Sequence, residues 1–249
     1  MIDYHCHLDL YPNPLKIFDE VKSKEIDVLA VTTSPRAYIK TSQYFCDSEK
    51  VRVAMGFHPE LVAQRQNEWS LFMETLKKCN YIGEIGIDGS QRFRDSLDIQ
   101  TVFFKEALME AEKDLGHIIS IHSRGATKQV LSAIERTKNN SKHVLHWFMG
   151  SLKEVEWAIG LGCWFSVNPK MCESKQGQNI INNLPQNRIL PETDAPFVTF
   201  KNRPYYPWDE TVPKYIAEIN NISLDSVMAM FNDNLRELER KSRQGGQTL

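Results

Sequence analysis

The sequence of 249 residues predicts an α/β fold, a single (β/α)8 TIM barrel. Short runs of apolar and β-branched residues alternate with amphipathic stretches along the chain, which predicts parallel strands joined by helical crossovers. Eight such units are present, and eight usually close into a barrel. No composition shift, Gly/Ser linker or low-complexity tract divides the chain. We therefore expect one domain over residues 1–243 and a frayed tail at 244–249.

The expected strands are short and rich in Ile, Val and Leu, as buried parallel strands usually are. Turn residues or helix-start signals follow them, such as Pro35 after the second strand. The segments are residues 1–4, 26–31, 51–57, 81–88, 117–122, 144–146, 162–167 and 188–190, the last of which leads on to Asp194.

Apolar residues at helical spacing predict the crossovers. In the segment 97–114 we expect the apolar stripe to consist of Val102, Phe103, Leu108, Met109 and Leu115. Further helices are expected over residues 14–25, from 35, over 68–78, around 130–134, and over 210–219 and 224–238.

Composition excludes several classes of protein. Apolar residues make up 41% of the chain and charged residues 25%, as in ordinary soluble globular domains. The formal net charge of −2 excludes a globally basic protein, so contact with nucleic acid would need a local patch. We find no secretory h-region and no long apolar run, and therefore expect a cytoplasmic protein without membrane spans. Five cysteines without a C-x-x-C pair favour free thiols.

Residue types that bind metals stand where the expected strands end. His5 and His7 lie two apart at the end of the first strand, so their side chains project from the same face. Chemistry in a (β/α)8 barrel sits at the C-terminal ends of the strands. The sequence therefore predicts that these imidazoles meet the polar groups of the fourth, fifth, sixth and eighth strands at one rim. Those groups are Glu84, Asp88, His122, His146 and Asp194.

Four histidines and two carboxylates are more than one metal ion with an open position needs. Imidazole and carboxylate together suit Zn²⁺, Mn²⁺ or similar divalent ions, whereas carboxylate and water favour Mg²⁺. The set is about right for two ions that share a bridging ligand, which can activate water and stabilise the oxygens in phosphoryl transfer. Such hydrolysis needs no Ser or Cys nucleophile, and the chain contains no G-x-S-x-G elbow.

The order of these residues resembles the TatD family of metal-dependent deoxyribonucleases along nearly the whole chain. The matching segments are HxH at residues 5–7, GEIGID at 83–88, IHSR at 121–124, HWFxG at 146–150 and ETDAP at 192–196. The resemblance implies a barrel of the metal-dependent hydrolase (amidohydrolase-like) type that hydrolyses DNA phosphodiester bonds with two divalent ions.

The same resemblance implies roles for six residues. Glu84 would bridge the two ions and Asp194 would act on the attacking water, so these two are the catalytic candidates. The implied metal ligands are His5, His7, Glu84 and Asp194 for the first ion, and Glu84, His122 and His146 for the second.

Several segments resemble more narrowly the TatD-like branch found in the Qat anti-phage defence cassette. They are YP at residues 11–12, VTTSPR at 31–36, DGS at 88–90, HWF at 146–148 and GCWFSV at 162–167. This resemblance implies a bacterial defence role alongside other Qat cassette proteins. The chain departs from the wider family at Gly89, where an aromatic residue is common, and at Glu60, where many relatives have His. These departures bear on substrate choice.

Further residues are candidates for substrate binding. His58 ends the third strand, where it would contact phosphate, support a ligand or cap a helix. Arg124 follows His122 closely enough to grip phosphate at the rim, with a salt bridge at a helix start as the alternative. Asp88 is expected to support a ligand histidine or to fix the rim. Aromatic residues of the rim loops would stack bases or simply pack; they are Trp147, Phe197, Tyr205, Tyr206 and Trp208.

Three hypotheses of function remain open from the sequence. The first is a nuclease that cleaves DNA, with single strands or ends favoured because a barrel mouth is narrow. The second is hydrolysis of another ester or amide, although Glu84 stands where many amidase relatives use a modified lysine. The third is a metal-binding scaffold subunit of a defence complex with little activity of its own.

Overall fold

The computed structural model describes residues 1–45, 48–113, 116–137 and 140–240. The expected tail at 244–249 lies outside these ranges. The barrel strands are β1 (Ile2–Cys6), β2 (Asp27–Val31), β3 (Val51–Ala54), β4 (Tyr81–Gly86), β5 (Ile118–His122), β6 (Lys142–His146), β7 (Trp164–Val167) and β8 (Ile189–Pro191).

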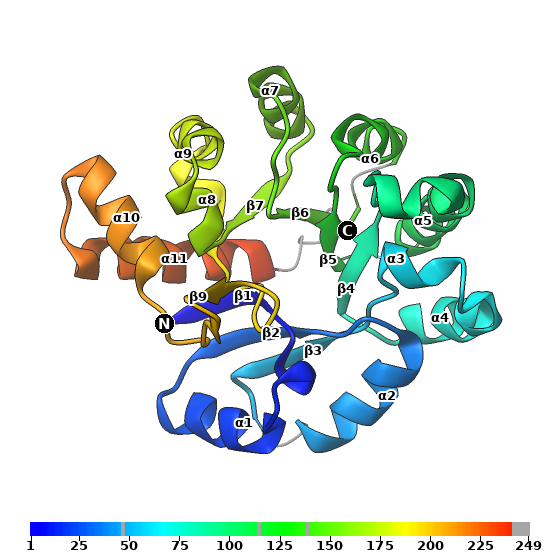
Figure 1. Ribbon diagram of the computed structural model, residues 1–249, viewed down its shortest axis with the longest axis horizontal. Coiled ribbons are helices and arrows are strands. Elements are labelled where there is room, and N and C mark those ends of the chain that lie inside the picture. The colour runs from blue at the N-terminus through cyan, green and yellow to red at the C-terminus, as the bar shows by residue number, and fades with distance from the viewer. Residues whose placement is uncertain (46–47, 114–115, 138–139, 241–249) are drawn as a thin grey trace, which may run out of the picture.

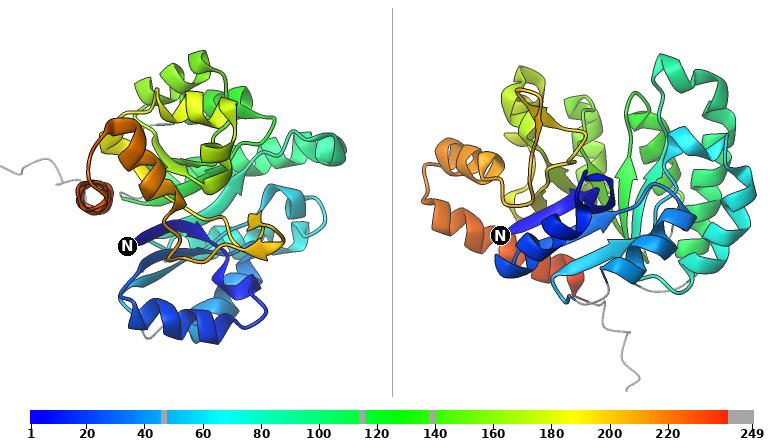
Figure 2. Two further views of the ribbon diagram at one scale, coloured as in Figure 1. Left: turned by 60° about the vertical axis from the view of Figure 1, so that its left-hand side comes forward. Right: turned by 60° about the horizontal axis from the view of Figure 1, so that its bottom comes forward.

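The eight strands pair in sequence order and close on themselves. Strands β1 to β3 form one parallel run and β4 to β8 form another. At one junction the Met55 N–H donates to the Tyr81 carbonyl oxygen over 3.2 Å. At the other, the Asp194 N–H donates to the His5 carbonyl oxygen over 2.9 Å. The fold is therefore the (β/α)8 barrel that the sequence predicts, with the helices outside (Figure 1, Figure 2).

Helices follow the strands around the outside of the barrel (Figure 1). Several begin with proline, whose fixed φ and missing N–H suit the first position of a helix. They are α1 (Pro14–Ser23), α2 (Pro35–Tyr44), α3 (Pro59–Val62), α4 (Trp69–Leu76), α5 (Leu97–Ala111), α6 (Thr127–Ile134), α7 (Leu152–Gly160), α8 (Pro169–Glu173), α9 (Lys175–Ile181), α10 (Thr211–Asn220) and α11 (Leu224–Glu239). The short 3-10 turns are η1 (Leu8–Leu10), η2 (Gln66–Glu68), η3 (Gln91–Ser96) and η4 (Gln186–Arg188).

The buried face of α5 differs from the predicted stripe. Phe103 and Leu108 are buried as expected, but Val102 and Met109 are 49% and 69% exposed. The helix turns so that residues 103, 104, 107, 108 and 111 face the barrel. The prediction chose the wrong pair of apolar residues because the sequence offers apolar side chains on more than one face. Leu115 lies outside the described residues.

A small antiparallel hairpin, β9 (Thr199–Phe200) and β10 (Arg203–Pro204), stands between β8 and α10 (Figure 2). The sequence analysis does not predict it, because two-residue strands are too short for a hydrophobic pattern to appear. The hairpin carries Phe200 at a strand end, and Phe197 lies just before it, so aromatic side chains reach the neighbourhood of the barrel mouth.

Two findings bear on the expected class of protein. Every helix in the described ranges is too short or too polar to span a lipid bilayer. Of the cysteines within those ranges, all are buried and free of disulfides; they are Cys6, Cys79, Cys163 and Cys172. Cys46 lies outside the described residues.

Candidate metal centre

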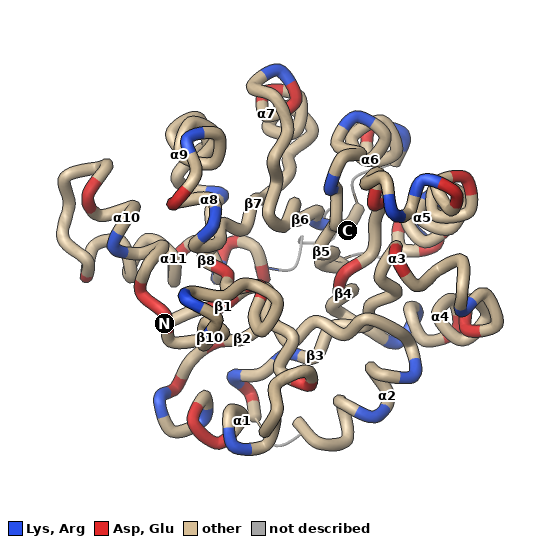
Figure 3. Tube along the Cα trace, in the orientation of Figure 1, with Lys and Arg blue, Asp and Glu red and all other residues tan. Residues whose placement is uncertain are grey.

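The six candidate ligands come together, buried, inside one end of the barrel. β1 carries His5 and is followed directly by His7, while β4 carries Glu84. The remaining groups lie at the ends of β5 and β6 and just beyond β8; they are His122, His146 and Asp194. Acidic residues occur at the barrel centre near β4 and β8 as well as on the outer helices, and Lys and Arg lie mainly on the outer helices and loops (Figure 3). This is the convergence at one rim that the parallel fold predicts.

One oxygen of Glu84 faces the two histidines of the first strand. Its Oε2 lies 3.3 Å from His7 Nε2 and 3.7 Å from His5 Nε2. Asp194 Oδ1 approaches the same two nitrogens, at 3.5 Å from His7 and 3.9 Å from His5. Two imidazoles and two carboxylates thus surround a single point.

The other oxygen of Glu84 faces a second set of imidazoles. Oε1 lies 3.0 Å from His122 Nδ1 and 3.4 Å from His146 Nε2. His58 Nε2 also lies 3.0 Å from the same oxygen. A carboxylate whose two oxygens address separate groups of nitrogens has the arrangement that a bridging ligand needs.

The residues present fit divalent cations. Within the described residues, three buried atoms that face the first point have no hydrogen-bond partner: His5 Nε2, His7 Nε2 and Glu84 Oε2. Leaving a buried polar atom unpaired costs about 1–3 kcal/mol, and more for a charged group. A cation bound to these lone pairs would remove that cost, and nitrogen with carboxylate oxygen is a donor set that Zn²⁺ and Mn²⁺ accept.

Three of the histidines are held through their outer ring nitrogens. His5 Nδ1 lies 2.8 Å from Ser120 Oγ, and His122 Nε2 lies 2.9 Å from Asp88 Oδ2. His146 Nδ1 lies 3.3 Å from Glu192 Oε1. When the outer nitrogen donates to an acceptor, the neutral ring keeps a lone pair on its inner nitrogen, as a metal ligand must. Asp88 therefore supports a histidine, as expected.

His58 has the opposite arrangement. Its Nδ1 accepts a hydrogen bond from the Glu60 backbone N–H over 3.2 Å, which caps α3. The ring hydrogen must then be on Nε2, which faces Glu84 Oε1. Both the neutral and the protonated ring carry this hydrogen, so His58 presents a hydrogen-bond donor to the site and not a lone pair.

Three supporting residues are absent from the sequence-based list of site residues: Asp3, Ser120 and Glu192. The Asp3 carboxylate accepts bonds from the Thr193 N–H at 2.9 Å and from the Thr193 hydroxyl at 2.6 Å. Burial raises the pKa of Asp3 to about 7 against these bonds. A usable signal was present for Asp3, which stands two residues from His5 on the same strand and so shares its face. Glu192 stands in the ETDAP segment at residues 192–196.

Electrostatics favours positive charge at this site. Burial opposes ionisation of Glu84, but the imidazoles of His58, His122 and His146 outweigh it and hold the pKa of Glu84 well below its ordinary value. Burial likewise opposes charge on His7, but its contacts with the carboxylates of Asp194 and Glu84 raise the pKa of His7 to about 10. The centre therefore has anionic carboxylates that need cations, whether protons or metals.

Two residues of the site, Asp194 and Trp147, have a left-handed backbone conformation. Asp194 and Trp147 have φ angles of 51° and 41°, in the left-handed region that side chains disfavour. The Trp147 N–H donates to Glu192 Oε1 over 3.1 Å, and the Asp194 N–H donates to the His5 carbonyl. Such strain costs on the order of 1–3 kcal/mol and is typically retained at functional sites.

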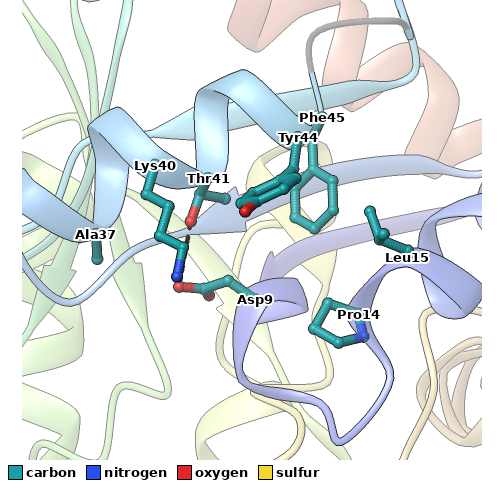
Figure 4. Close-up of a pocket in the computed structure, with 8 residues that line it drawn as sticks. All are labelled: Asp9, Pro14, Leu15, Ala37, Lys40, Thr41, Tyr44 and Phe45. Atoms are coloured by element: carbon teal, nitrogen blue, oxygen red, sulfur yellow. Dashed lines mark hydrogen bonds between the residues drawn. The ribbon is translucent and has the colours of Figure 1, made fainter.

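Two hollows on the surface of the barrel differ in whether candidate metal ligands line them. One of about 370 Å³ lies between η1 and α2, where Thr41 Oγ1 donates to Asp9 over 3.3 Å and Tyr44 and Leu15 form part of the wall (Figure 4). None of the candidate ligands lines it. A hollow of about 410 Å³ is lined by His122 and His146, together with the exposed Arg124.

Replacement of Asp88 by Ala is expected to weaken binding of Zn²⁺ or Mn²⁺ by about 10- to 100-fold, the usual loss when a residue supporting a ligand histidine is removed. His122 would lose the acceptor that fixes its tautomer. Isothermal titration with each metal measures the effect, and Asp95→Ala, an exposed carboxylate on the following turn, is the matched control. Equal affinities for the two variants would contradict the supporting role.

Known proteins resemble this chain in sequence and in fold. The chain is 26% identical to human deoxyribonuclease TATDN3, over 98% of this chain and 96% of that protein. It is 24% identical to the uncharacterized metal-dependent hydrolase YabD of Bacillus subtilis (strain 168), over 96% and 99% of the two chains. The crystal structure of YJJV, a TatD homologue from Escherichia coli K12, matches the fold with a TM-score of 0.83 at 21% identity, over 96% and 97%. The model of the TatD related DNase family matches residues 2–240, and the chain therefore belongs to that family.

Proposed function

We propose that this chain is a nuclease that hydrolyses DNA phosphodiester bonds with two divalent metal ions. The observation that carries the proposal is the position of Glu84, whose two oxygens face separate sets of imidazoles. Family membership supports an enzyme of the hydrolase class. Its relatives include a protein described as a deoxyribonuclease and another described as a metal-dependent hydrolase.

The proposed ligands follow from the two groups of atoms around Glu84. When bound, the ions, whether Zn²⁺, Mn²⁺ or Mg²⁺, would supply an activated water molecule and neutralise charge on the phosphate. The proposed ligand sets are His5, His7, Glu84 and Asp194 for one ion, and Glu84, His122 and His146 for the other.

Asp194 is the proposed acceptor of the proton that the attacking water loses. Burial opposes its ionisation, but contact with His7 and the charges of His146 and His5 keep the pKa of Asp194 below its ordinary value. It is therefore anionic at neutral pH, as a base must be. Its backbone N–H is held by the His5 carbonyl, which fixes the main chain from which the carboxylate projects.

His58 and Arg124 are the proposed contacts for substrate phosphate. His58 carries its hydrogen on Nε2, at the edge of the site, and its side chain is 15% exposed. Arg124 lies exposed in the hollow that His122 and His146 also line. An imidazole N–H and a guanidinium are both donors that suit phosphate oxygens.

The test is cleavage of a labelled single-stranded oligonucleotide with Mn²⁺ or Mg²⁺. We expect cleavage that a chelator abolishes, and a rate about 10²- to 10⁴-fold lower in Asp194→Asn, since this is the usual contribution of a general base. Asp225→Asn, an exposed first-turn residue of α11, is the control. Failure of the wild type to cleave with any divalent metal, or equal cleavage by Asp194→Asn, would overturn the proposal.

We further propose that the enzyme acts in the bacterial cytoplasm as the QatD component of anti-phage defence, together with other Qat cassette proteins. The support is the resemblance of the segments at residues 31–36, 88–90 and 162–167 to that branch. Phage plaque counts on cells that carry the cassette with wild-type or Glu84→Gln protein test the proposal. Equal protection by both would argue for a scaffold role, and no protection by either would overturn the defence role.

A further inference from the structure

A hollow of about 580 Å³ opens beside the candidate metal ligands and is lined by two aromatic side chains. Trp147 and Met149, just after β6, line one part of it, and Phe197, just before the β9–β10 hairpin, lines another. Lys170 of α8 also reaches it and pairs with Glu173 at 2.7 Å. The volume falls in the range of about 300–1,000 Å³ that is usual for sites of small planar ligands.

Trp147 and Phe197 both contact candidate metal ligands or the groups that support them. The Trp147 N–H donates to the same Glu192 oxygen that lies 3.3 Å from His146 Nδ1. The Phe197 ring packs edge-on against the His7 ring, with centroids 4.9 Å apart and planes at 80°. A group bound between the two walls would therefore lie next to the metal centre.

The two rings differ in how far they are exposed. Phe197 is 62% exposed, which leaves a large apolar ring in water. Trp147 is half-buried and packs against buried hydrophobic side chains of the core. One ring is thus held by packing against the core and the other presents an open aromatic face, so a flat ring in the hollow could contact both.

A second hollow, which also has Trp147 in its lining, contains a positively charged side chain, Arg124. The hollow of about 410 Å³ shares Trp147 and Met149 with the first one and is also lined by His122 and Arg124. Among the described residues, no carboxylate forms an ion pair with the exposed Arg124. An exposed guanidinium of this kind suits the phosphate of an adjoining nucleotide.

We propose that the hollow between Trp147 and Phe197 binds one unpaired nucleobase of the substrate strand, next to the phosphate that is cleaved. This inference rests on the proposed nuclease function and adds the part of the substrate that is recognised. Stacking on aromatic rings accepts any base. A base paired within a duplex cannot enter between two side chains, so the site selects single strands or frayed ends.

The experiment compares two exposed phenylalanines. Phe197→Ala removes one wall, whereas Phe200→Ala removes an aromatic ring that is 53% exposed on the same hairpin but does not line this hollow. Phe197→Leu keeps apolar contact with His7 but cannot stack. The substrates are an oligothymidylate, which has bases, and an oligonucleotide of the same length made of abasic residues, which has the same phosphodiester bonds but no aromatic ring.

We expect Phe197→Ala and Phe197→Leu to raise KM for the oligothymidylate by roughly 5- to 100-fold, as loss of base stacking usually does. Cleavage of the abasic oligonucleotide and the metal content should not change, and Phe200→Ala should match the wild type on both substrates. A wild-type KM in Phe197→Ala, or an equal loss on both substrates, would overturn the base-binding site.

Binding without turnover separates this inference from the proposed function. A fluorescent oligothymidylate is titrated into Asp194→Asn protein with and without Phe197→Ala, and its anisotropy is measured. Weaker binding in the double variant supports the base site even if the wild type fails to cleave DNA, in which case only the nuclease proposal falls. Equal binding by both proteins would overturn the base site and leave cleavage as a separate question.

Discussion

Glu84→Gln is expected to remove both metal ions from the chain and to lower kcat/KM for DNA by roughly 10³-fold or more. Metal stabilisation of the reacting phosphate contributes several kcal/mol, and each ~1.4 kcal/mol is a tenfold change in rate. The effect should be this large because the Glu84 oxygens face both sets of imidazoles. An amide has one poor donor oxygen and no charge, so it cannot replace the carboxylate on both sides.

The test of Glu84→Gln is its metal content per chain, measured by elemental analysis after dialysis. Glu106→Gln, the same change at an exposed position of α5, should keep the wild-type content and activity. Circular dichroism of Glu84→Gln should remain that of a folded barrel. Retention of both ions, or of wild-type turnover, would show that Glu84 is not the bridge.

Gly56→Ala is expected to prevent stable folding, with a loss of more than about 4 kcal/mol in the free energy of unfolding, a value reached only by severe core defects. A Cβ at this position would lie 1.7 Å from the Thr32 carbonyl oxygen and 2.9 Å from its carbon. These are backbone atoms of the neighbouring β-segment and cannot swing aside. The next residue, Phe57, donates its N–H to the Glu84 carbonyl over 3.2 Å, so any shift would reach the metal centre.

Gly160→Ala provides the matched control, because a Cβ there meets nothing within 4 Å at the end of α7. That variant should be more stable than the wild type by about 0.5–1 kcal/mol, since alanine favours helix over glycine. Urea unfolding of both variants measures the difference. A Gly56→Ala protein as stable as the wild type would show that the strands can separate at this point without cost.

The grouping of the candidate metal ligands was predictable in outline for a simple reason. Parallel strands in a barrel all end at the same rim, so residues far apart in sequence, such as His5 and Asp194, could be assigned to one place from strand positions alone. The side-chain period of two placed His5 and His7 on one face. Neither inference required any knowledge of the loops.

Other features did not follow from strand positions. The sequence analysis left the role of His58 open among three alternatives, and the direction of its hydrogen bond depends on the Glu60 N–H of the turn that follows. Ser120 supports His5 from across the barrel, a contact set by how β1 and β5 face one another. The stripe of α5 was partly wrong because the rotation of a helix depends on what it packs against.

The sequence by itself determined the (β/α)8 class and the residues that reach one rim, because hydrophobic periodicity and strand order are local properties of the chain. Only the tertiary structure decided which oxygen of Glu84 faces which imidazoles, which nitrogen of each ring is free, and where Phe197 stands beside His7. Those relations are distances of a few ångströms between elements that meet only when the barrel closes, and no spacing along the chain encodes them.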